Sequence, residues 1–154
     1  ISSKDKNTNE VFTSQLIINP TTSLFNEPVK MFGKPKQDIK NNEYRVLISE
    51  TVDSDNHDVL IYKGENNDVE TIRYTFYHSI PNSNSLGLSS IDVNFRKGSQ
   101  LENKISNFYK ERYIRDNSII TDWHGYDLNK TVKVGVRLNS VVSPNRYDAL
   151  YSKY

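Results

Sequence analysis

The chain of 154 residues contains no cysteine. This absence excludes disulfide bonds, thiolate nucleophiles, zinc sites with cysteine ligands and iron–sulfur clusters. Long apolar runs are missing too. None approaches the roughly 20 residues of a membrane-spanning helix, and no apolar signal segment opens the chain. We therefore expect no membrane-spanning segment.

An excess of charge of one sign is also missing, since 20 basic and 19 acidic residues leave a net charge of +1. No overall field favours nucleic acid or an anionic membrane as a partner. Basic and aromatic groups that could hold phosphates and stack bases do gather in one stretch. They are Lys104, Tyr109, Lys110, Arg112, Tyr113 and Arg115. Because Glu102 and Glu111 dilute this patch, we expect a solvated surface there and no nucleic-acid partner.

The short motifs of common enzymes are absent, among them G-x-S-x-G, H-E-x-x-H and the P-loop. Alanine occurs once and asparagine 18 times, a composition expected where codons are AT-rich. An exported domain of an AT-rich Gram-positive bacterium or its mobile elements fits these facts. A cytosolic protein or a viral structural subunit would fit them as well. Our leading expectation is an extracellular or cell-surface protein.

The length fits a single domain that buries its core without disulfides or a structural metal. Residues 1–10 are polar and begin with Ile1 rather than methionine, which is typical of a linker or a processed terminus. We predict a linker over residues 1–10 and one domain over residues 11–154. Residues 11–18 alternate weakly and are either a first strand or the end of the linker.

A short helix is predicted over residues 26–35, with an N-cap asparagine, proline in its first turn, a closing Gly33 and Pro35 just beyond. Val29 and Phe32 would face the core. The exit of this helix resembles the helix-to-sheet entry of many small secreted bacterial lipoproteins, a resemblance too common to name a family.

Strands follow, because apolar and polar residues alternate with a period of two. They are predicted at residues 44–50, 59–63, 71–80, 91–95 and 131–138, the first two as a hairpin. In the third strand the polar face carries Thr71, Arg73, Thr75 and Tyr77, and Ile72, Tyr74 and Phe76 lie on the other face.

The main helix is predicted from about Ser99 to Arg115, with Ser99 and Glu102 as a capping box. Apolar residues at helical spacing would pack on the sheet. They are Leu101, Ile105, Phe108 and Tyr109. A terminal helix over residues 143–154 is a further prediction, with disorder as its alternative.

These elements predict an α+β fold. We expect a single, strongly bent antiparallel sheet of five or six strands with one main helix packed on a face, in a cystatin-like or NTF2-like layout.

The best candidate for a binding site is a predicted loop over residues 122–127. Its members are Asp122, Trp123, His124, Tyr126 and Asp127. Aromatic rings beside carboxylates suit sugar rings or peptides, since the ring packs on C–H surface while aspartate accepts hydroxyl or amide protons. The alternative is that Trp123, the only tryptophan, points inward and anchors the loop.

We therefore expect a non-catalytic binding or assembly module that contacts a protein or glycan partner. One alternative is a small hydrolase in which His124 is the general base, oriented by Asp122 or Asp127. Another is a structural subunit of a larger assembly, which self-association would favour. The turn from Asp53 to Asp58 could hold a divalent cation, but acidic turns are common without one. We expect no metal and no cofactor.

Overall fold

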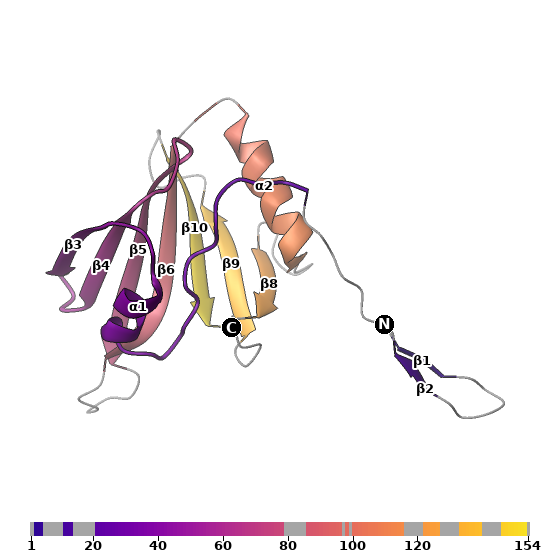
Figure 1. Ribbon diagram of the computed structural model, residues 1–154, viewed down its shortest axis with the longest axis horizontal. Helices are drawn as coiled ribbons and strands as arrows, with labels where there is room; N and C mark the ends of the chain where they lie inside the picture. Colours follow the sequence, from indigo (N-terminus) through magenta and orange to yellow (C-terminus); the bar gives the residue numbers. More distant parts are fainter. Residues whose placement is uncertain are drawn as a thin grey trace.

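The computed structural model describes residues 2–4, 11–13, 21–78, 86–96, 98, 100–115, 122–126, 133–139 and 146–153. Within them, eight strands form one antiparallel sheet (Figure 1). These are β3 (Leu47–Val52), β4 (Asp58–Lys63), β5 (Val69–His78), β6 (Leu86–Arg96), β7 (Ile114–Arg115), β8 (Asp122–Tyr126), β9 (Lys133–Asn139) and β10 (Arg146–Lys153). Strands β1 (Ser2–Lys4) and β2 (Val11–Thr13) pair with each other in a separate two-stranded sheet.

The strand order in the large sheet is β3-β4-β5-β6-β10-β9-β8-β7. The α+β class and the single antiparallel main sheet are confirmed, but the prediction of five or six strands is wrong. The additional strands are β10, in the middle of the sheet, and the short β7 and β8 beyond β9 (Figure 1).

The predicted terminal helix is wrong, because residues 146–153 form strand β10 between β6 and β9. Ala149 and Tyr151 are fully buried, whereas Asp148 and Leu150, which alternate with them, are only partly buried. This period of two is that of a strand with one face in the core. The tyrosines near the chain end also occur at helical spacing, which is why the sequence favoured a helix.

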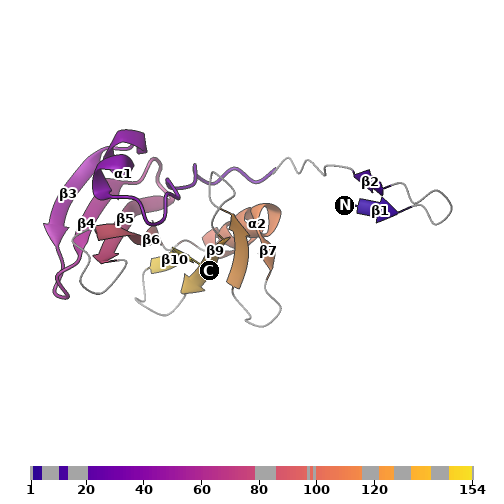
Figure 2. The same cartoon turned by 90° about the horizontal axis from the view of Figure 1, so that it is seen from below.

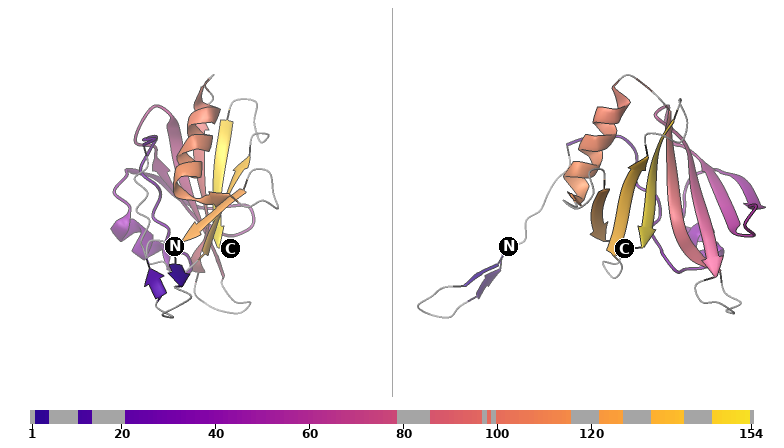
Figure 3. Two further views of the ribbon diagram at one scale, coloured as in Figure 1. Left: turned by 90° about the vertical axis from the view of Figure 1, so that its right-hand side faces the viewer. Right: turned by 180° about the vertical axis from the view of Figure 1, so that it is seen from behind.

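All helices of the described residues lie on one face of the sheet. Figure 2 shows helix α1 (Lys36–Asn42) and residues 21–35 on the side where helix α2 (Leu101–Arg112) lies. Their apolar side chains join those of the strands in one core cluster. The helices and the 21–35 segment contribute Leu24, Phe25, Phe32, Ile39, Leu101, Ile105, Phe108 and Tyr109. No helix of the described residues covers the opposite face of the sheet, which we therefore call the uncovered face and which points toward the viewer in the right-hand view of Figure 3.

Helix α2 matches its prediction in its buried face, which consists of the four expected residues. Its start differs. The N-cap position is Gln100, which makes no side-chain capping hydrogen bond, and the predicted cap Ser99 lies outside the described residues. Neither helix is long and apolar enough to span a membrane, as far as the described residues go.

The helix predicted over residues 26–35 is wrong. The segment contains no helix and turns at residues 32–33, and α1 begins only after Pro35, its N-cap residue. The reason is tertiary, since backbone groups of the segment form hydrogen bonds with partners far along the chain. The Val29 N–H donates to the Tyr74 hydroxyl at 3.0 Å. Gly33, at φ +80°, donates its N–H to the Leu88 carbonyl at 2.8 Å. Phe32 is buried as predicted.

A buried ion pair holds the end of α1 to the sheet. The Arg45 Nη1 atom lies 2.9 Å from Glu43 Oε1, and the two side chains are 2% and 0% exposed. Glu43 also accepts a hydrogen bond from the Tyr74 hydroxyl, and Arg45 contacts Glu65 at 3.1 Å. Because buried charges need partners, these four side chains form one mutually dependent cluster.

A second buried polar cluster joins residues 27–30 to α2 and β10. Lys30 lies 3.0 Å from Glu27 and 2.6 Å from the Tyr113 hydroxyl. Tyr113 and Tyr151 both donate to Glu27, and the hydroxyls of Tyr151 and Tyr109 are 2.8 Å apart. Burial raises the pKa of Tyr109 and Tyr151 far above the ordinary value for tyrosine. The tyrosines of this cluster therefore stay neutral, and their hydroxyls gather around the single carboxylate of Glu27.

Candidate functional site

Residues 122–126 form a strand rather than a loop, contrary to the prediction. Strand β8 pairs with β9 and β7, and its Trp123 is only 5% exposed. The indole stacks on Tyr109 with ring centroids 5.7 Å apart. A Cβ atom at Gly125 would lie 2.5 Å from the Tyr113 ring, so glycine permits this close packing. Trp123 therefore belongs to the core and offers almost no ring surface to a ligand.

The other predicted site residues are distributed along or beyond the same strand. His124 is partly buried and lies in register with Gly135 of β9. The backbones of Asp122 and Tyr126 are in register with Arg137 and Lys133. Asp127 lies outside the described residues. A binding role for this group stays a prediction.

The uncovered face carries a hollow of about 640 Å³, which we call the sheet-face hollow. Its lining comes from four neighbouring strands and the turn after β3. The lining residues are Asp53, Ile61, Thr71, Arg73, Thr75, Tyr77, Ser90, Asp92, Asn94 and Leu150. This volume falls within the roughly 300–1,000 Å³ of small-molecule sites.

Cross-strand register brings the polar groups of the hollow together. Arg73 of β5 lies opposite Asp92 of β6, which lies opposite Leu150 of β10. In the next row the Asn94 amide donates to the Thr71 hydroxyl at 3.0 Å. The floor of the hollow therefore carries charged, amide and hydroxyl groups side by side, and Leu150 adds apolar surface at its edge.

Asp92 is electrostatically unusual. The pKa of its carboxyl is raised to about 6, chiefly by burial; the Arg73 guanidinium opposes the rise and the nearby Asp148 carboxylate adds to it. The carboxyl therefore changes charge in the mildly acidic range, where most aspartates are fully ionised.

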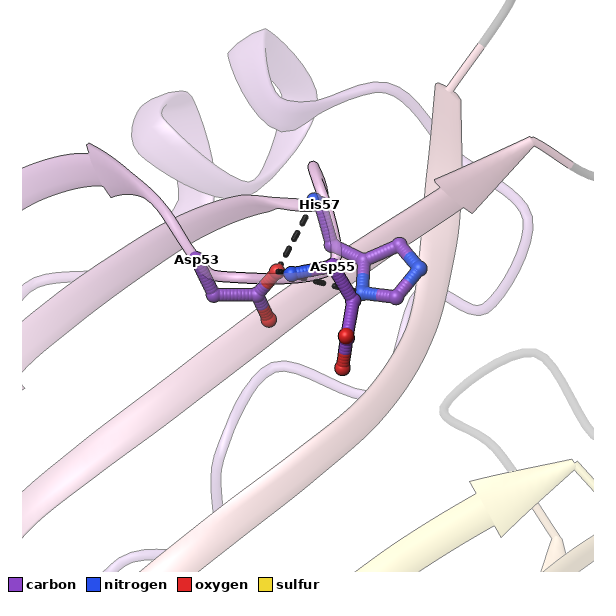
Figure 4. Close-up of side chains that lie close together, drawn as sticks. All are labelled: Asp53, Asp55 and His57. Carbon is purple, nitrogen blue, oxygen red and sulfur yellow. Dashed lines mark hydrogen bonds and ion pairs between the residues drawn. The ribbon is translucent and has the colours of Figure 1, made fainter.

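One wall of the hollow is the turn after β3, shown in Figure 4. Asp53 Oδ1 accepts the N–H groups of Asp55 at 3.0 Å and His57 at 2.9 Å, and these hydrogen bonds lower the pKa of Asp53. Asn56 is left-handed at φ 65°, which asparagine tolerates well. The His57 ring then packs on Tyr77 with centroids 4.0 Å apart.

The same turn brings Asp53, Asp55 and His57 within 4.8 Å of one another, in a group that could hold a metal ion. Contacts within the protein account for the arrangement of these three side chains without a metal ion. Asp53 Oδ1 already accepts backbone N–H groups of the turn. Asp53 Oδ2 lies 3.2 Å from the Arg73 guanidinium, a cation that would repel a metal ion. The cluster is therefore a structural turn that positions Arg73.

The sequence predicted the polar face of β5 correctly but not that it lines a hollow. The residues that complete the site lie on β4, β6 and β10, at positions that meet only when the strand register is set. The available signal was the polar alternation of Ser90, Asp92 and Asn94, which matches that of β5.

The comparisons with known proteins identify a family. A family model described as Protein of unknown function (DUF1248) matches residues 13–130. This region includes every lining residue of the hollow except Leu150. Neither the curated proteins nor the solved structures give a significant match.

Proposed function

The chain belongs to the family described as Protein of unknown function (DUF1248), and we propose that it is a non-catalytic binding module. It would hold a protein or glycan partner in the sheet-face hollow. The observation that carries the proposal is the hollow itself, since eight of its ten lining side chains bear hydrogen-bonding groups. Concave sites with a few convergent polar groups are where proteins bind ligands.

The structure around the hollow is preorganised. Asp53 holds Arg73, the Asp53 turn positions His57 against Tyr77, and Asn94 is bonded to Thr71. Side chains fixed before binding lose little entropy when a ligand arrives. No histidine or lysine is among the ten lining residues, and His124 of the hydrolase alternative lies on β8, away from them.

We also propose that the module acts outside the cell or at the cell surface, as its cysteine-free and asparagine-rich composition suggests. Its layout of one main helix on an antiparallel sheet would be cystatin-like or NTF2-like. Fractionation of cells that express the native gene tests the location. Recovery of the protein only from the cytosol would refute it.

The binding proposal is tested by amide chemical-shift mapping of the isotope-labelled chain. Neutral oligosaccharides, acidic oligosaccharides and short peptides are titrated separately. The proposal predicts that at least one class shifts the amides of β4, β5, β6 and β10 around the hollow. Failure of every class to perturb these strands would refute it. Asp38→Asn in α1, on the covered face, is the control variant that leaves binding unchanged.

A second candidate, a structural subunit, is favoured by the edge strand β3. Within the described residues no strand pairs with its outer edge, and Val46, Ile48 and Val52 are 69%, 55% and 52% exposed. Apolar edge strands pair readily with other strands. In this candidate function, β3 pairs with β3 of a second copy of the chain. Sedimentation velocity at rising concentration would show a dimer that Ile48→Lys abolishes, and a monomer at every concentration would refute this candidate.

A further inference from the structure

We propose that the ligand of the sheet-face hollow is an uncharged saccharide. The inference rests on the proposed binding function and deepens it by naming the ligand class. Three properties of the hollow lead to it: the order of its hydrogen-bonding groups, its single accessible ring, and its charge.

The hydrogen-bonding groups alternate as sugar hydroxyls require. Each sugar hydroxyl both donates and accepts, so it binds best between an acceptor and a donor. The Asp92 carboxyl is such an acceptor. Arg73 lies directly across from it and Asn94 follows on the same face of β6, and both donate. The acceptor therefore has a donor on the neighbouring strand and another two residues along its own strand, so that different hydroxyls of one sugar can be bound at the same time.

The hollow also offers one aromatic surface for the C–H face of a sugar. The Tyr77 side chain is 39% exposed, and packing against His57 holds its ring. Ile61 and Leu150 supply apolar surface on two further sides. A ring of this kind packs on apolar C–H surface while the hydroxyls remain free to bind polar groups.

The charges of the hollow disfavour acidic ligands. Its lining holds two carboxyl groups, Asp53 and Asp92, and one cation, Arg73, which is already 3.2 Å from Asp53. Asp148 lies in register with Asn94 and adds further negative potential at Asp92. Within the ten lining residues, a sugar acid, a sulfated sugar or an acidic peptide would meet two carboxyl groups and a single cation that already pairs with Asp53.

An extended peptide is disfavoured for a different reason. Peptides that dock on sheets usually pair their backbone with an open strand edge. The strands that line the hollow, β4, β5, β6 and β10, each have a neighbour on both sides. The hollow therefore offers a peptide backbone only side chains, whereas sugar hydroxyls need nothing else.

Titration calorimetry at pH 7.5 tests the inference with neutral cello-, malto-, manno- and chito-oligosaccharides, oligogalacturonate as the acidic sugar, and short peptides. We expect at least one neutral sugar to bind. Asp92→Asn, which removes a charged acceptor, and Tyr77→Ala, which removes the packing ring, should each weaken it about tenfold or more. Tyr44→Ala, which removes an exposed ring outside the hollow, should leave the affinity unchanged.

The outcomes separate the two proposals. Binding in the hollow by oligogalacturonate or peptide alone would overturn the saccharide inference and leave the binding module intact. Neutral-sugar binding that neither hollow variant weakens would overturn the inference as well. If no probe binds and no lining strand shows amide shifts, both proposals fail.

Discussion

Replacing Glu43 with glutamine should destabilise the fold by about 3 kcal/mol. The substitution keeps the side-chain shape but removes the charge that pairs with Arg45, and both side chains are almost fully buried. Breaking a buried ion pair by removing one partner typically costs about 3–5 kcal/mol, because the remaining charge is left uncompensated. We expect the lower end, since Glu65 still lies 3.1 Å from Arg45. For a chain of this size the melting temperature should fall by about 6–12 °C.

Urea unfolding followed by the fluorescence of the single, buried Trp123 measures this change. Glu50→Gln is the matched control, because Glu50 pairs with two lysines, Lys36 and Lys40, at the surface. Exposed pairs contribute little, so its midpoint should hardly move.

A double variant sharpens the test. Adding Arg45→Met to Glu43→Gln removes the uncompensated charge, so the double variant should be more stable than Glu43→Gln alone. Equal midpoints for Glu43→Gln and the Glu50→Gln control, or no recovery in the double variant, would refute the buried-pair reasoning.

Three further predictions concern stability and packing. Asp92→Asn should stabilise the fold at pH 8 by at most about 3 kcal/mol and have no effect near pH 3. The folded pKa of about 6 exceeds the ordinary 3.8, so the cost of ionising Asp92 is absent below 3.8 and complete above 6. Urea midpoints at both pH values check this, and equal effects would contradict it. Gly125→Ala should crowd Tyr113 and destabilise the fold by about 1–3 kcal/mol, measured as a lower thermal midpoint, whereas Gly98→Ala, whose Cβ would meet its nearest neighbour at 3.8 Å, should be tolerated. Acrylamide should quench Trp123 weakly in the folded protein and strongly in urea, and strong quenching in the folded state would place the indole outside the core.

Segments in which apolar residues follow a single period, either that of a strand or that of a helix, were predicted well. The sequence of β5 alternates from Thr71 to Tyr77 and α2 has four apolar residues at helical spacing, so local sequence and tertiary packing agree. The helix prediction for residues 26–35 was wrong because the N-cap and proline signals are local, while backbone groups of this segment form hydrogen bonds with distant partners such as Tyr74 and Leu88. The terminal helix predicted over residues 143–154 was wrong because Tyr147 and Tyr151 fit both the helical period and the strand period. Only pairing with the neighbouring strands selects the strand.

The site was harder to predict than the fold. Trp123 lies in a polar stretch of sequence, and only the position of Tyr109 on α2 shows that its ring stacks inside. The hollow depends on register in four strands, and a slip of one residue would exchange its polar groups for core side chains. No local motif contains that information.

The most direct test of the central claim is an amide chemical-shift map of the labelled protein with neutral oligosaccharides at neutral pH. The account predicts that the largest shifts fall on residues 71–77 and 90–94, which line the sheet-face hollow. Shifts confined to β8 or to the β3 edge, or none at all with any of these sugars, would contradict it.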